Sequence, residues 1–565
     1  MKKILKHKKL ISYGFLFIIA LIVMIPMFFA NADITRDDGI QHICRLIGTA
    51  SSITEGQFFP NIMSNFCNGF GYSWNIFYSP ITAYLPLVFQ IFTSSYALML
   101  KLFIFICLVA SGIAMFAFIF EVTKSYKVSL IASIVYMISP YHLTDVYIRV
   151  AVAELASFVF LPLVFLGLYN LLEKDGKKSY YIAIGAIGLI LSHTVITLIT
   201  AILSFVYVIV HYKKLKEKKV WLILGISVFL ILFVTAFFTL PLLEHKMATS
   251  YEVFVPGRME WTDKLIYNKL EFYRLFYTPQ GEIPCDIGIV TVIGLILSAI
   301  VIKKLPKEKK KTYLSFLTIG LVLLLMTLTI FPFEHLPSMI KMLQFPWRLL
   351  EFTSFLFSFV VAINVMYLIK NMKKADIIVI TILALLCTYP IFSNLRYNEN
   401  YDESKYIPAV RVTEQTGRVH AGMASFEYLP SKAFEHLDYI KQRENKTIRL
   451  EGDIKINKEQ KQGTSLEIEF QNSKEGTILE LPYIYYLGYQ IELTTKFSSD
   501  SHGRTKLEYT ESENGMIQIT MPEVSKGLIK VSYIGSNGMK TGLILSTIGI
   551  ILLVFFVIYI KKIKG

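Results

Sequence analysis

Long apolar segments alternate with short polar or basic stretches along most of this chain of 565 residues. A helix that crosses the hydrocarbon core of a bilayer needs about 20 predominantly apolar residues. The pattern therefore predicts twelve membrane-spanning helices, near residues 10–30, 97–120, 127–141, 155–172, 180–193, 195–212, 220–243, 286–302, 313–331, 346–370, 376–393 and 539–560.

Lysine clusters fall almost entirely on every second loop, as at Lys2 to Lys9, Lys213 to Lys219 and Lys303 to Lys311. Basic residues beside a span stay on the cytoplasmic side. Twelve spans place both termini in the cytoplasm. One long helix over 180–212 would put the Lys213 cluster outside, so we expect a break at His193.

Composition adds little beyond this topology, since 54% of the residues are hydrophobic and only 18% are charged. The net charge of +15 is explained by cytoplasmic lysines and contact with anionic lipid, and nucleic acid is not implied as a partner. Cys44 and Cys67 both fall outside the predicted spans. They are equally compatible with a disulfide bridge and with two free thiols.

Three outward-facing regions remain between the spans, at 31–96, 244–285 and 394–538. The last has short alternating strands such as 448–452, 466–470 and 529–533, separated by Gly, Asn, Ser and Lys turns. We therefore expect a multi-span domain over 1–393, an extracytoplasmic β-sandwich over 394–538, and a final anchor with a basic tail over 539–565.

The first outer region carries the densest group of ionisable residues. A helix is predicted there with Ile40, Ile43, Cys44 and Ile47 on one side and Asp38, His42 and Arg45 on the other. Such a helix is expected to lie in the membrane interface and to hold its polar side chains over the headgroups. Alternatively, Asp38 and Gln41 form a capping box, and the carboxylate only begins the helix.

A second group of charges lies at the outer ends of later spans. Ionisable residues at membrane depth are costly unless they pair, so Asp145, Arg149 and Glu154 are expected to face the interior of the bundle. An Arg149–Glu154 pair is equally explained by architecture alone. His193 is either a helix-end residue or part of a site, and Arg348 either binds a phosphate or extends towards the interface.

Several motifs together resemble the YfhO-like bacterial membrane proteins, some of which are called pyruvoyl-tetrahydropterin-synthase-related. They are Asp38-Gly39-x-x-His42-x-x-Arg45, Gly56-Gln57-x-x-Pro60, Asn68-Gly69-x-Gly71-Tyr72, Ser139-Pro140-Tyr141 with Tyr147 and Arg149, and Gln344-Phe345-Pro346-Trp347-Arg348. The resemblance covers most of the chain and implies the plasma membrane of a bacterium, taken to be Gram-positive. It does not imply pterin chemistry.

The chain is also similar to the C superfamily of integral-membrane glycosyltransferases, which place an acidic residue in the first outer loop and use lipid-phosphate sugars as donors. This resemblance implies that Asp38, or else Asp37, activates the acceptor or binds a divalent metal. His42, Arg45, Arg149, Glu154, His193 and Arg348 then contact a polyprenyl-phosphate-sugar donor or a cell-envelope glycan or lipid acceptor. A transporter or flippase of envelope precursors and a non-catalytic glycan-binding scaffold are the alternatives.

Overall fold

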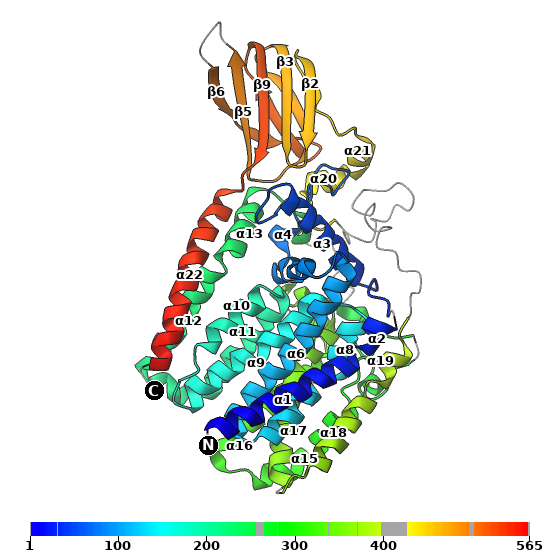
Figure 1. Cartoon of the computed structure of the whole chain (residues 1–565), viewed down its shortest axis with the longest axis vertical. Coiled ribbons are helices and arrows are strands. Elements are labelled where there is room, and N and C mark those ends of the chain that lie inside the picture. Colours follow the sequence, from blue (N-terminus) through cyan, green and yellow to red (C-terminus); the bar gives the residue numbers. More distant parts are fainter. Residues whose placement is uncertain are drawn as a thin grey trace.

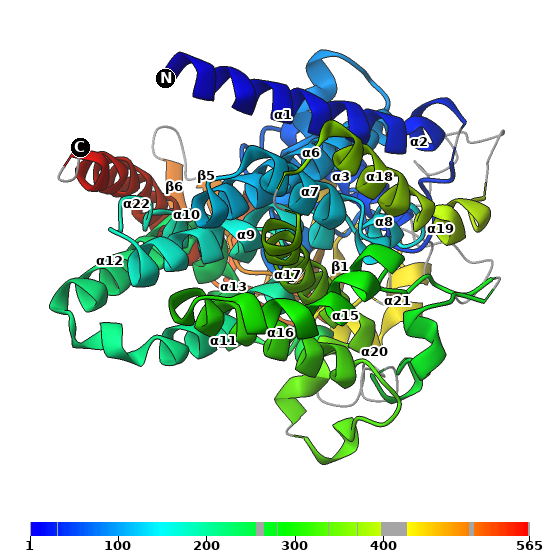
Figure 2. The same cartoon turned by 90° about the horizontal axis from the view of Figure 1, so that it is seen from below.

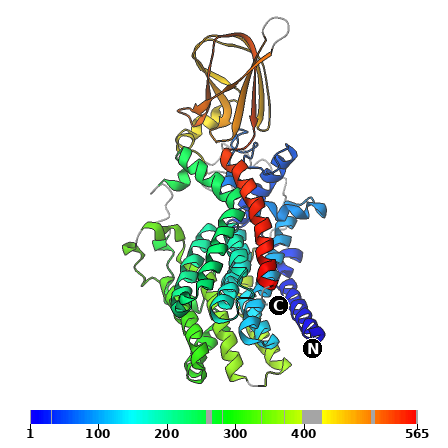
Figure 3. The ribbon, with the colours of Figure 1, turned by 90° about the vertical axis from the view of Figure 1, so that its left-hand side faces the viewer.

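The computed structural model describes residues 2–30, 32–255, 265–279, 281–336, 338–369, 371–396, 426–496 and 502–562. A bundle of helices makes up one part of the molecule, and a region of β-strands lies beyond one end of the bundle (Figures 1 and 3). The outer domain was expected over 394–538, and its residues 397–425 lie outside the described residues.

Most of the bundle is formed before residue 249. Its helices are α1 (Lys2–Val23), α2 (Ile25–Phe29), α3 (Gly39–Thr54), α4 (Trp74–Phe77), α5 (Ile81–Tyr84), η1 (Pro86–Ile91), α6 (Tyr96–Thr123), α7 (Tyr126–Met137), α8 (Pro140–Tyr147), α9 (Val152–Glu173), α10 (Tyr181–Ile190), α11 (Thr194–Val210), η2 (Tyr212–Lys216), α12 (Lys218–Val234) and α13 (Ala236–Ala248).

Later helices complete the bundle and lead into the β-region. They are η3 (Glu252–Phe254), η4 (Phe272–Leu275), α15 (Ile289–Lys304), α16 (Lys307–Met326), η5 (Phe333–His335), η6 (Ser338–Leu343), η7 (Pro346–Leu349), α17 (Leu350–Leu368), α18 (Lys374–Leu386), α19 (Tyr389–Ser393), α20 (Ser431–Glu435), α21 (Leu437–Gln442) and α22 (Asn537–Lys562).

Fewer helices than expected are individually long and apolar enough to cross a membrane. In the described part of the chain five meet that condition, or six if α12 and α13, which meet at an angle of 68°, form one span. The segment expected at 127–141 is divided between α7 and α8 because Pro140 begins a new helix. The break expected at His193 is present, between α10 and α11.

Helix α17 lies in the middle of the bundle, with α9, α15 and α16 around it (Figure 2). Its apolar part is 89% buried inside the protein, and that of α9 is 83% buried. These two helices therefore pack against protein on nearly all sides, so polar residues at their outer ends contact other side chains rather than lipid.

The last helix, α22, packs beside α12 and α13 (Figure 1). Ser546 contacts the bend between those two helices: its hydroxyl donates to the carbonyl of Phe233 at 3.1 Å and accepts from the amide of Phe237 at 2.9 Å. A bend frees backbone groups of this kind, and in a membrane they need a protein partner. Ser546 supplies that partner.

The β-region contains nine strands among the described residues: β1 (Ile448–Glu451), β2 (Lys455–Gln462), β3 (Ser465–Ser473), β4 (Thr477–Ile484), β5 (Tyr489–Lys496), β6 (His502–Leu507), β7 (Tyr509–Glu511), β8 (Met516–Met521) and β9 (Val524–Tyr533). They form two antiparallel sheets, ordered β1-β4-β8-β7 and β2-β3-β9-β5-β6. Apolar side chains from both sheets, such as Ile468 and Leu479, share one core. Alternation of buried and exposed residues along β3 fits this arrangement.

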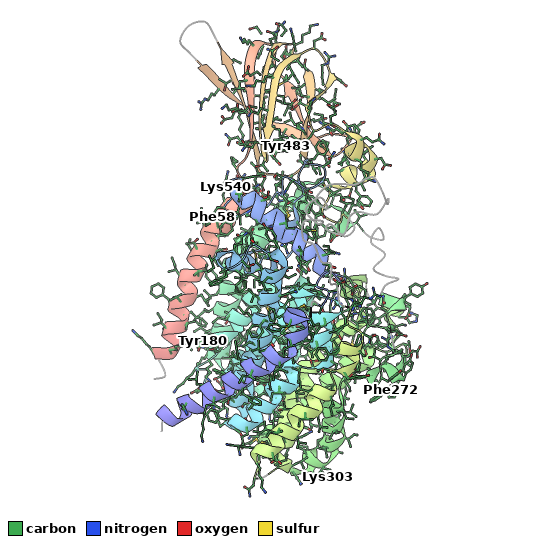
Figure 4. All side chains as sticks on the ribbon, turned by 45° about the vertical axis from the view of Figure 1, so that its right-hand side comes forward. Phe58, Tyr180, Phe272, Lys303, Tyr483 and Lys540 are labelled. Carbon is green, nitrogen blue, oxygen red and sulfur yellow. The ribbon has the colours of Figure 1, made fainter. Side chains whose placement is uncertain are left out.

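The β-region is attached by direct hydrogen bonds to the loop between α3 and α4. Lys461 Nζ donates to the carbonyl oxygens of Gly69 at 2.6 Å and Pro482 at 2.7 Å, and to Asn445 Oδ1 at 2.6 Å. The amide of Ile484, at the end of β4, donates to the carbonyl of Phe70 at 3.0 Å. The end of the β-region nearest the bundle, where Figure 4 labels Tyr483, is therefore fixed to the loop that follows α3.

Candidate functional site

Glu154 is the centre of a buried charge cluster at the start of α9. Its two carboxylate oxygens each accept from a terminal nitrogen of Arg149 at 3.0 Å, and Oε1 also accepts from Arg348 Nε at 2.8 Å. The hydroxyl of Tyr141 donates to Oε2 at 2.9 Å. All four side chains are almost completely removed from solvent. Glu154 thus joins α8, α9 and η7.

Arg149 reaches Glu154 because the chain reverses between α8 and α9, where Val150 has a φ of 49°. Nη1 of Arg149 also contacts Asp145 Oδ1 at 2.7 Å and the Tyr141 hydroxyl at 3.0 Å. The expectation that Asp145, Arg149 and Glu154 face the interior of the bundle is therefore confirmed. Since both terminal nitrogens of Arg149 contact protein, its geometry fits an architectural role.

Arg348 differs from Arg149 in having a nitrogen to spare. Nε binds Glu154, and Nη1 donates to the carbonyl of Leu343 at 2.8 Å and to Gln344 Oε1 at 2.9 Å. Among the described residues no hydrogen bond reaches Nη2. Only 4% of Arg348 is exposed, so the guanidinium is held rigidly by protein.

Asp38 lies immediately before α3 and is tied to Arg149 through the main chain. Its amide donates to the Arg149 carbonyl at 3.0 Å. Its side chain makes no capping hydrogen bond, so the capping box expected with Gln41 is absent. Burial raises the pKa of the Asp38 carboxyl, while the guanidinium of Arg149 acts in the opposite direction. The carboxyl is half-buried, close to the charge cluster and without a hydrogen-bond partner among the described residues.

Asp37 is placed differently from Asp38. Its side chain is exposed and its backbone has a φ of 40°, in the left-handed region that non-glycine residues rarely adopt. The turn at Asp37 directs Asp38 towards Arg149. The guanidinium of Arg149 acts on both carboxyl groups, and Glu154 and Arg348 also act on that of Asp38.

His193 fits both of its expected roles, because it caps a helix and also lies close to the charge cluster. Its Nδ1 accepts from the amide of Ile196 at 3.3 Å, which makes it the cap of α11. Its Nε2 lies 3.9 Å from Glu154 Oε1, just beyond hydrogen-bond distance. A neutral ring that accepts at Nδ1 carries its proton on Nε2, so this N–H points towards the cluster as a donor.

His42 and Arg45 contradict the expected surface helix. The structure encloses α3 in protein, and Arg45 is fully buried with its nitrogens donating to Asn75, Thr82 and the carbonyl of Tyr78. Burial lowers the pKa of His42 to about 3, so that its ring is neutral. The structure packs both side chains between α3 and the following turns instead of on an exposed face, and their contact with substrate stays a prediction.

Two residues of the site were missed in the sequence. Glu351, one turn after Arg348, is fully buried, and its Oε1 lies 2.7 Å from the hydroxyl of Ser157 on α9. A glutamate inside an apolar span was a signal for Glu351, since such residues are costly in lipid. No local signal marks Ser157, which meets Glu351 only after α9 and α17 have packed.

The cysteines and the possible metal-ligating side chains bear on two other kinds of site, a disulfide and a metal centre. Cys44 and Cys67 are buried and are not joined by a disulfide bond, so of the two alternatives the structure shows the unbridged one. In the residues the structure describes, no three His, Cys, Asp or Glu side chains are grouped as metal ligands are.

Comparison with known proteins finds similarity to a family of membrane proteins and to one bacterial protein over nearly its whole length. Residues 76–395 match the family described as 6-pyruvoyl-tetrahydropterin synthase related domain, a membrane protein family. An uncharacterized protein of Lactococcus lactis subsp. cremoris is 25% identical, over 97% of this chain and 96% of the relative. No solved structure matches the chain. The matched region contains Arg149, Glu154, His193 and Arg348, and Asp38 precedes it.

Proposed function

The chain belongs to the 6-pyruvoyl-tetrahydropterin synthase related family of membrane proteins, and we propose that it is an integral-membrane glycosyltransferase. In this proposal it transfers a sugar from a polyprenyl phosphate to a hydroxyl group of a cell-envelope polymer or lipid, on the outer face of the plasma membrane. One observation carries the proposal: a half-buried carboxylate without a hydrogen-bond partner among the described residues, Asp38, lies within the electrostatic reach of a buried guanidinium with an unused nitrogen, Arg348.

Glycosyl transfer needs both of these groups. The acceptor hydroxyl loses its proton to Asp38 while its oxygen attacks the anomeric carbon of the donor. The bond between that carbon and the phosphate oxygen breaks, and its electron pair stays on the lipid phosphate. Nη2 of Arg348 and Nε2–H of His193 stabilise the negative charge that develops there.

The raised pKa of Asp38 suits this role. A base that accepts a proton works best when its pKa lies nearer the working pH than that of an exposed aspartate. Burial provides this shift, and the nearby guanidinium groups keep the carboxylate available in its ionised form. Arg149 and Glu154 position Arg348 and do not contact substrate in this proposal.

The proposed site requires a defined topology. We propose twelve membrane crossings, in which short helices such as α10 and α11 cross as parts of a larger bundle, with both termini in the cytoplasm. The two sheets then form an extracytoplasmic β-sandwich above the site. In Figure 4, Lys303 lies at the end of the bundle farthest from the β-region and Lys540 at the end beside it, which agrees with this orientation.

The decisive experiment measures sugar transfer in vesicles that contain the purified protein. A polyprenyl-phosphate sugar is supplied with cell-envelope acceptor, and wild type is compared with Asp38→Asn. Transfer by wild type that is lost in the variant supports the proposal. Absence of transfer from polyprenyl-phosphate donors by wild type, while the same donors are bound, would favour a scaffold.

A flippase of envelope precursors is the second candidate, and the breaks in the helices favour it. Helices α12 and α13 meet at 68°, and α10 gives way to α11 at His193. Transporters use discontinuous helices of this kind around their substrate sites. Movement of a labelled polyprenyl-phosphate lipid between leaflets, unaffected by Asp38→Asn, would support this candidate over the transferase.

A further inference from the structure

The contacts around the Ser157 hydroxyl indicate whether Glu351 carries a proton. The Ser157 hydroxyl lies 2.6 Å from the carbonyl oxygen of Glu154 and 2.7 Å from Glu351 Oε1. A serine hydroxyl has one proton to donate. If Glu351 were ionised, the Ser157 proton would be the only one available for both contacts. One of the two oxygen–oxygen contacts would then contain no proton and would be repulsive.

If Glu351 carries a proton, both contacts become hydrogen bonds. Glu351 Oε1–H then donates to Ser157 Oγ, and the Ser157 hydroxyl donates to the Glu154 carbonyl. Each of the two short contacts then has a proton of its own, at an ordinary distance for a bond between oxygens.

The other oxygen of Glu351 supports the same conclusion. Oε2 is fully buried and has no partner among the described residues. Burying an ionised oxygen without a partner costs far more free energy than burying the carbonyl oxygen of a neutral acid.

Charges around Glu351 point the same way. The charged groups that act on it are Glu154 and Asp145, which are negative, and Arg348, which is positive. Arg348 already binds Glu154 through Nε. A second ionised carboxylate here would compete with Glu154 for the guanidinium.

We propose that Glu351 and Ser157 form a proton-binding site within the membrane, in which Glu351 remains a neutral carboxylic acid at neutral pH. In this state Glu154 is the carboxylate that holds Arg348, and Nη2 of Arg348 stays available for an anion. Glu351 is thus a positioning residue that acts through Arg348. This last step, but not the protonation itself, rests on the proposed binding of a lipid phosphate.

Infrared spectroscopy of the full-length protein tests the protonation directly. The spectrum of Glu351→Gln, subtracted from that of wild type, should show the carbonyl stretch of a protonated carboxyl group. Ser157→Ala should shift this band, because the acid loses its hydrogen-bond acceptor. A difference spectrum that contains only the bands of an ionised carboxylate would overturn the proposal.

Binding tests the effect on the site. The probe is a polyprenyl monophosphate in lipid nanodiscs that contain wild type or Glu351→Gln. Wild-type affinity should weaken several-fold as the medium becomes alkaline and Glu351 loses its proton, and the carboxamide variant should lose most of this pH dependence. Equal pH dependence in both proteins would refute the positioning role. If wild type binds no lipid phosphate, the proposed function fails, while the infrared result still decides the proton site.

Discussion

The amide of Asp38 donates a hydrogen bond to the carbonyl oxygen of Arg149 at 3.0 Å. This bond joins the first outer region to the turn between α8 and α9. It sets the position of the proposed base relative to the guanidinium that holds Glu154. The two halves of the site, more than a hundred residues apart in sequence, are therefore coupled by the main chain and not only by charge.

Asp38→Asn should abolish transfer without unfolding the protein. The amide retains the size of the side chain and cannot accept the proton, so the rate should fall by about a hundredfold or more. Stability should change little, since the carboxylate makes no capping hydrogen bond. Asp37→Asn is the matched control, because Asp37 is exposed and asparagine tolerates its positive φ. Equal losses in both variants would argue against a specific base.

The acid limb of the pH–rate profile should report Asp38. The base must be ionised to accept a proton, and burial raises its pKa, so activity should fall as the pH drops through a value above the usual aspartate pKa of about 3.9. Initial rates in vesicles, measured where the protein remains folded, check this. A rate that stays constant down to about pH 4 would exclude a carboxyl with a raised pKa as the base.

Arg149→Ala should be far more damaging to folding than to chemistry. It leaves Asp145 buried without its cation and leaves Glu154 with Arg348 as its remaining ion-pair partner, and breaking a buried ion pair costs about 3–5 kcal/mol. We expect poor yield and a clearly lower unfolding temperature in detergent. An Arg149→Ala protein as stable as wild type would contradict the architectural role.

Arg348→Lys keeps a charge but not the planar guanidinium, and it should weaken donor use less than Arg348→Ala does.

Ser546→Ala tests how the bend between α12 and α13 is stabilised. The change removes the hydroxyl that accepts from the Phe237 amide and donates to the Phe233 carbonyl, which keeps the Thr235 amide as a donor, and should cost about 1–2 kcal/mol. Thr547→Ala is the control, since that exposed hydroxyl bonds only to its own helix. Unfolding in mixed micelles measures both. Equal stability of the two variants would show that the bend does not need α22.

Topology is tested by labelling engineered cysteines in intact cells. The side chain of Lys474 in the β-region is 72% exposed, so Lys474→Cys should react with a reagent that cannot cross the membrane. Lys303→Cys, at the opposite end of the bundle, should react only after permeabilisation. The native cysteines are mostly buried and should contribute little background. The reverse pattern would overturn the proposed orientation.

Sequence patterns anticipated the parts of this protein that depend on local or repeated signals. The break at His193 followed from the lysine distribution, and the inward-facing group of Asp145, Arg149 and Glu154 followed from the cost of charge in lipid. The strands of the β-region followed from their alternation.

Long-range packing accounts for what the sequence did not reveal. The polar face of α3 looked exposed, yet Arg45 is buried by the turns that contain Asn75 and Thr82. No pattern in the sequence singles out Lys461, which lies in β2. In the structure it contacts Gly69, and burial lowers its pKa to about 7. Such contacts depend on where whole elements meet, and no local pattern encodes that.

The ion pair between Glu154 and Arg348 also has a consequence for biosynthesis. The two residues are 194 positions apart, so Glu154 enters the membrane long before its distant partner has been translated. Arg149, five positions away, is made just before Glu154 and can neutralise it at once. Helix α9 can therefore enter the bilayer with the Arg149–Glu154 ion pair already formed. The pair keeps Glu154 neutralised until α17 is inserted and packs in the centre of the bundle.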